Sequence, residues 1–249
     1  MSATRHIFVL TLALALLVPA AHGASRRRSV RSGPVASQPS NCHTFGLVRA
    51  GLKASYLSVA PGGNVTFTVT YISDTPTQTK TTQHVVAPSG TSDVDTTLDG
   101  EIVGTLRALK HIKTVGSTTV PVIGKVTTEV NIDFVPSLAA GPAQGWCTGA
   151  TWTVSPSTET ITTSGGSFPL PPVIVTTAGS VGQVLAVGES ITVAGGTFNT
   201  VKYRGAIVSG QTVQPAITWV SMTENIVVKQ DTLDTNGAVT STTELTAVQ

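Results

Sequence analysis

Three histidines beyond residue 23, His43, His84 and His111, are the side chains best suited to acid–base chemistry or metal binding. A zinc site needs three or four ligands that meet in space, and some of them usually stand close together in the sequence. These histidines stand far apart. We therefore expect each of them to act singly, and the sequence predicts no metal site.

The carboxylates cluster once, between Ser92 and Glu101. The run begins like a calcium loop, but Thr97 and Leu98 stand where such a loop needs a further acid and its glycine. The motifs of serine hydrolases, zinc proteases, phosphate-binding loops and dinucleotide sites are absent from the sequence. We therefore predict no catalytic residue and no cofactor, and we expect a protein that is not an enzyme.

The two cysteines, Cys42 and Cys147, offer a different kind of chemistry. Neither lies in a Cys-x-x-Cys or nucleophile motif, so a reactive thiol is the weaker interpretation. In an oxidising compartment they would pair. The sequence therefore predicts a structural disulfide that ties the start of the domain to the region around Trp146.

The first 23 residues have the pattern of a secretory signal peptide. Arg5 and His6 precede an apolar run from Ile7 to Val18, and small residues stand at the −3 and −1 positions before a cleavage site after Gly23. The run is shorter than the roughly 20 residues needed to span a bilayer. We expect an exported chain, periplasmic or extracellular, without a transmembrane segment after cleavage.

Residues 24–41 form a basic leader, which we expect to be disordered. The formal net charge of the whole chain is only +2. A charge this small does not favour nucleic acid as a partner.

The rest of the chain has the composition and pattern of strands. Only 11% of the residues are charged, and threonine and valine dominate. Val65 to Tyr71 and Val126 to Phe134 alternate between apolar and polar side chains, as half-buried antiparallel strands do. The segment Leu98–Lys113 has helix-compatible spacing but also fits a pair of strands. The predicted fold is all-β, or β-dominated with one short helix.

Turn residues indicate how the strands connect. Asn236-Gly237 and Ala194-Gly195-Gly196 predict tight hairpins. The proline-rich segment 164–172 is expected to be a crossover within one domain that covers residues 42–249. Asn64 begins an Asn-x-Thr glycosylation sequon, which matters only in a host with that machinery.

The C-terminal third contains four short motifs in a row: Glu189–Phe198, Thr218–Val220, Ile226–Gln230 and Ser241–Thr246. This part of the chain resembles exported, β-rich bacterial proteins that are similar to the half-barrel of the LolA/LolB lipoprotein carriers. The resemblance implies a curved antiparallel sheet, or half-barrel, with an apolar concave face. A two-sheet β-sandwich is the alternative.

These observations favour a non-catalytic binding protein for an apolar or lipid-like small molecule. Such a ligand would lie against the concave face of a curved sheet. The predicted lining residues are Phe198, Val201, Tyr203, Trp219 and Val227. The alternatives are a structural or adhesive protein that contacts a component of the cell envelope and, less favoured, a hydrolase built on loops.

Overall fold

The computed structural model describes residues 41–249 except 88–89, 121–123, 165–170, 178 and 210–211. The predicted signal peptide and the leader up to Ser40 therefore lie outside the described residues. The strands are β1 Cys42–His43, β2 Lys53–Ala60, β3 Gly63–Asp74, β4 Gln78–Ala87, β5 Gly90–Val103, β6 Leu106–Val120, β7 Gly124–Pro142, β8 Trp146–Cys147, β9 Thr151–Val154, β10 Ser157–Ser164, β11 Val173–Thr177, β12 Ser180–Val193, β13 Gly196–Ser209, β14 Thr212–Ser221, β15 Val227–Leu233 and β16 Val239–Val248.

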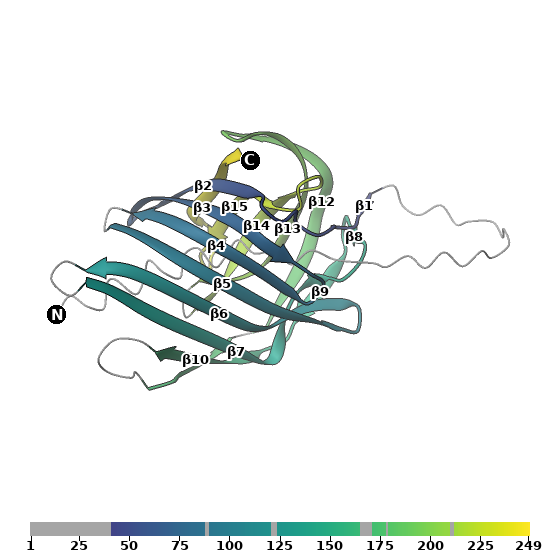
Figure 1. The fold of residues 1–249 in the computed structure, drawn as a ribbon. Coiled ribbons are helices and arrows are strands. Elements are labelled where there is room, and N and C mark those ends of the chain that lie inside the picture. Colours follow the sequence, from purple (N-terminus) through teal and green to yellow (C-terminus); the bar gives the residue numbers. More distant parts are fainter. Residues whose placement is uncertain (1–40, 88–89, 121–123, 165–170, 178, 210–211) are drawn as a thin grey trace, which may run out of the picture.

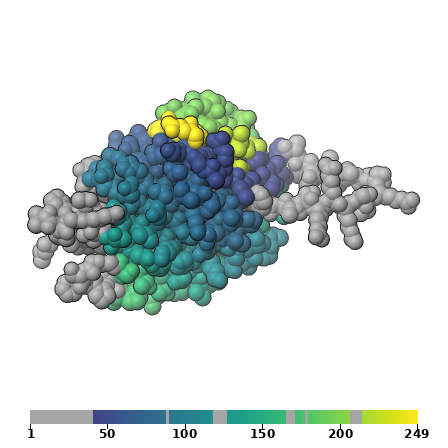
Figure 2. Space-filling model, viewed as in Figure 1, coloured from purple at the N-terminus to yellow at the C-terminus, as the bar shows by residue number. Residues whose placement is uncertain are grey.

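Fourteen of these strands form one antiparallel sheet, in the order β11-β10-β7-β6-β5-β4-β3-β2-β16-β15-β14-β13-β12-β9. The sheet folds over itself into two facing layers (Figure 1). The front layer consists of β2–β7, β10 and β11, and the rear layer consists of β9 and β12–β16. In the space-filling view the front layer presents one broad surface (Figure 2). The prediction of an all-β fold with a curved antiparallel sheet is confirmed.

The two outermost strands of this order meet at one seam. Only Ser155 and Pro156 separate β9 from β10, and two residues separate β11 from β12. The same register continues across both gaps, from Val154 opposite Ser180 to Ser157 opposite Thr177. Proline has no N–H to donate to a ladder. The hydrogen-bonded ladder is therefore interrupted at the seam, and the sheet stays open there.

Two of the alternatives left open by the sequence are wrong. Leu98–Lys113 is not a helix but the end of β5, a turn at Gly104 with φ 60°, and the start of β6. Cross-strand burial of Leu98 against Ile112 outweighs the helical spacing of the apolar residues. The two layers are also not separate sheets, because β2 pairs with β16 and makes one ladder of them.

The predicted hairpins are confirmed. The β15–β16 turn holds Gly237 at φ 83°, and the Gly237 N–H donates to the Asp234 carbonyl. The β12–β13 hairpin turns between Val193 and Gly196. Segment 164–172 lies largely outside the described residues, and the strands on its two sides, β10 and β11, are paired neighbours.

One apolar core lies between the layers. Tyr56 joins them directly, because it stacks on Phe67 of the front layer at 5.1 Å and donates its hydroxyl proton to the Val227 carbonyl of the rear layer at 3.1 Å. Leu245 and Val220 of the rear layer belong to the same buried cluster. The fold therefore encloses the inner faces of both layers.

Candidate functional site

An aromatic cluster closes one end of the interior. Trp146 lies with its ring centroid 5.3 Å from Phe45, 5.6 Å from Trp152 and 5.1 Å from Tyr203. Gly141 and Gly182 make room for the two indoles, because a Cβ at either position would overlap a tryptophan ring. We call this group the aromatic plug.

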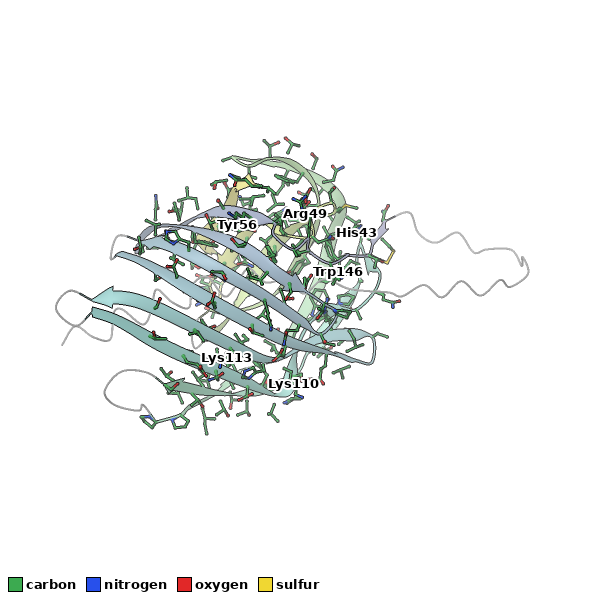
Figure 3. The ribbon with its side chains drawn as sticks, viewed as in Figure 1. His43, Arg49, Tyr56, Lys110, Lys113 and Trp146 are labelled. Carbon is green, nitrogen blue, oxygen red and sulfur yellow. A yellow bond between two sulfur atoms is a disulfide. The ribbon has the colours of Figure 1, made fainter. Side chains whose placement is uncertain are left out.

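The predicted disulfide holds the plug in place. Cys42 of β1 is bonded to Cys147 of β8, directly opposite it in a two-stranded ribbon at this end of the molecule (Figure 3). The next cross-strand pair of this ribbon is His43 and Trp146, and Trp146 belongs to the plug. Burial lowers the pKa of His43. The bond therefore ties the N-terminal end of the domain to the plug.

The five predicted lining residues do not share one face. Val201, Tyr203 and Val227 are buried in the core between the layers. Tyr203 belongs to the plug, and burial raises its pKa to about 12 despite a hydrogen bond with Thr218. Phe198 has the opposite parity to Val201 on β13 and is half-buried.

Trp219 points away from the interior. It is the cross-strand neighbour of Lys202 and Lys229, whose amines lie 4.9 Å and 5.7 Å from its ring. Lys229 also pairs with Glu244 at 3.1 Å. Trp219 is thus covered by lysine side chains on the outer face of the rear layer, where such cation–π contacts stabilise it.

The end of the interior opposite the plug is reached by solvent. Along the inner face of β10, exposure increases from Glu159 and Ile161, which are buried, to Thr163, which is half-buried. The inner faces of β5 and β7 show the same gradient, from Val94 to Ser92 and from Val130 to Thr128. We call this end, where β2–β3, β4–β5 and β6–β7 turn, the open end.

Buried polar side chains line the front layer between the plug and the open end. Thr81, Thr96 and Thr114 are cross-strand neighbours on β4, β5 and β6, and all three are buried. The hydroxyls of Thr81 and Thr96 have no hydrogen-bond partner. A buried polar group without a partner costs about 1–3 kcal/mol, so these two hydroxyls mark a place where a bound molecule or water would be stabilised.

Glu159 is the one carboxylate among the buried side chains of the described residues. It is fully buried on β10, between Phe134 of β7 and Val175 of β11, and neither carboxylate oxygen has a hydrogen-bond partner. Burial raises the pKa of Glu159. Together with Thr81 and Thr96, it makes the inner face of the front layer the candidate functional site.

Sequence reasoning did not identify this site. Alternation from Val65 to Tyr71 places threonines opposite the apolar face of the strand, whereas the threonines at positions 81, 96 and 114 face the interior. A signal for Glu159 was present, because alternation in Ser157–Ser164 places it on the same face as Ile161. A carboxylate on the apolar face of a strand is unusual.

The other histidines lie on the outer face of the front layer. His84 Nδ1 is 2.7 Å from Asp93 Oδ1, and His111 Nδ1 is 2.8 Å from Asp133 Oδ1. These pairs belong to different strand pairs, β4–β5 and β6–β7. Within the described part of the chain, no group of three or more metal-ligating side chains could hold an ion.

Comparison with known proteins adds no assignment to this site. The sequence matches no protein-family model and no curated protein. Among the described residues, no helix has the length and hydropathy needed to cross a membrane.

Proposed function

We propose that this chain is an exported, non-catalytic binding protein whose folded sheet holds an amphipathic small molecule between its layers. The observation that carries the proposal is the set of buried, unpartnered polar groups on the inner face of the front layer: Thr81, Thr96 and Glu159. The cross-strand neighbours of Glu159, Phe134 and Val175, are apolar, so the complementary ligand has an apolar body and a polar group.

The geometry also supports a route of entry. The plug and the disulfide close one end, and inner-face side chains become exposed toward the open end. Export is supported by the signal-like N-terminal pattern and by the disulfide, which persists in oxidising compartments. The resemblance to half-barrel lipoprotein carriers agrees with this proposal.

A test of the binding proposal is native mass spectrometry of the full chain, expressed into an oxidising compartment and purified without detergent. We expect the mass of a chain cleaved after Gly23, with the disulfide intact, plus an added mass of several hundred daltons that is lost on organic extraction. The bare chain mass in repeated preparations, together with no binding of long-chain amphiphiles, would contradict the proposal.

A pair of matched variants locates the site. Thr81→Val with Thr96→Val removes two inward hydroxyls at almost constant volume, and we expect it to weaken ligand binding while the fold is retained. The control, Thr82→Val with Thr97→Val, changes the adjacent residues on the outer face of the same strands. Equal loss of ligand in both variants would contradict an interior site.

A structural or adhesive role is the second candidate, and one observation favours it. Val135 of β7 and Ile174 of β11 are each 69% exposed on the outer face, on the two strands that flank β10. Exposed apolar side chains near a sheet edge favour contact with another macromolecule. Co-purification with envelope material, lost in Val135→Thr with Ile174→Thr while no small molecule is bound, would favour this role.

A further inference from the structure

Glu159 lies farther from the open end than Ile161 and Thr163, on the same inner face of β10. On the inner face of β10, Thr163 is half-buried, Ile161 is buried and Glu159 is fully buried. The distance from Thr163 to Glu159 is about 13 Å, or four residues at about 3.3 Å each. Val130 and Ile132 of β7 are the cross-strand neighbours of Thr163 and Ile161, so the surface beside these residues is apolar.

Among the described residues, no cation pairs with this carboxylate. None of the ion pairs among the described residues includes Glu159. Lys113, Lys202 and Lys229 all pair with carboxylates on the outer faces. Arg107 is buried, but it donates to the backbone carbonyls of Thr75 and Pro76 in the turn between β3 and β4.

A buried carboxylate without a counter-ion is strongly destabilised, so it is normally paired or protonated. Burial raises the pKa of Glu159, as expected for such a site. An ammonium group supplies the N–H donors that the carboxylate oxygens lack, and it also supplies the missing positive charge. The apolar side chains between Glu159 and Thr163 suit an alkyl or other apolar body attached to that ammonium group.

We infer that the interior site is selective for amphipathic primary amines, with the ammonium group on Glu159 and the apolar body extending along β10 toward the open end. This inference rests on the proposed function, because it requires that the interior binds a small molecule. It goes beyond that proposal by naming the charge of the ligand and the residue that selects it.

The test compares three probes of equal chain length: dodecylamine, dodecanol and dodecanoate. Affinities for the full-length exported protein are measured by isothermal titration calorimetry, below the concentrations at which the probes aggregate. We expect dodecylamine to bind at least tenfold more tightly than dodecanol. Of the three probes, dodecanoate should bind most weakly. If dodecanol or dodecanoate binds as tightly as the amine, the selectivity is refuted while the proposed binding function stands.

The variant Glu159→Gln retains the shape of the side chain and removes its charge. We expect it to weaken dodecylamine binding at least tenfold and to leave dodecanol binding unchanged. The control Glu129→Gln lies on the outer face of β7, where Glu129 pairs with Lys113, and should leave both affinities unchanged. Unchanged amine binding by Glu159→Gln would overturn the inference. If this variant fails to fold, the order of the affinities of the three probes for the unmodified protein decides the question. If none of the three probes binds, the proposed function fails as well.

Discussion

The close approach of Trp152 to Gly182 makes the aromatic plug sensitive to a single methyl group. These residues are cross-strand neighbours on β9 and β12, and the indole lies across the glycine. A Cβ at position 182 would lie 2.0 Å from Trp152 Cε2 and 2.2 Å from Cζ2. Ordinary van der Waals contact is 3.4–4 Å, so Gly182→Ala must displace the ring by 1.4 Å or more (3.4 − 2.0).

The ring has little freedom to make that movement. Trp146 lies 5.6 Å and Tyr203 lies 6.1 Å from Trp152, measured between ring centroids. Overpacking a buried cluster of this kind costs about 1–3 kcal/mol. Because the interior is close-packed and the indole is almost fully buried, we expect Gly182→Ala to fall in the upper half of that range. This is a large share of a typical unfolding free energy of about 5–15 kcal/mol.

The assay is urea unfolding followed by tryptophan fluorescence. With an m-value of about 2–3 kcal/mol/M, the midpoint of Gly182→Ala should fall by about 1 M. The control is Gly62→Ala, where a Cβ meets no atom within 4 Å. In a double-mutant cycle, Gly182→Ala should cost much less when Trp152 is replaced by leucine, because the overlap is relieved. Equal midpoints for Gly182→Ala and Gly62→Ala would refute this account of the plug.

Three further predictions concern the disulfide, the buried carboxyl group and the contact between the layers. Replacing Cys42 and Cys147 by serine should lower the unfolding free energy by up to about 4–5 kcal/mol, since the bond closes a loop of 105 residues; an unfolding midpoint insensitive to reductant in the unmodified protein would contradict this. The pKa of Glu159 is raised in the folded state, so its contribution to stability is fully present below its unfolded pKa, about 4.3, and is lost as the pH rises through the higher folded pKa. Thermal unfolding of the ligand-free protein across this interval should show a decline that Glu159→Gln reduces, and identical pH profiles for the two proteins would argue against it. Tyr56→Phe removes the hydroxyl that donates to the Val227 carbonyl and should lower the free energy of unfolding, measured in urea, by about 0.5–1.5 kcal/mol. A gain in stability would contradict this expectation.

Local chemistry made several parts of this structure predictable. Asn236-Gly237 supplies the positive φ of its hairpin wherever the hairpin lies in the fold, so the β15–β16 turn could be identified from two residues. The alternation from Val65 to Tyr71 likewise determines which side chains of β3 share a face. The disulfide was predictable because the chain has only two cysteines and a pattern typical of export.

The sequence by itself therefore determined the strand content, the hairpin turns and the pairing of Cys42 with Cys147, because each depends on backbone preference or on residue chemistry. Only the tertiary structure decided which face of each strand lies inside. Trp219 is apolar yet faces outward beneath two lysines, whereas Thr81 and Glu159 are polar yet face the interior. The physical reason is that an alternating pattern shows which residues lie together, but burial depends on how distant strands, such as β2 and β15, which Tyr56 joins, fold over one another.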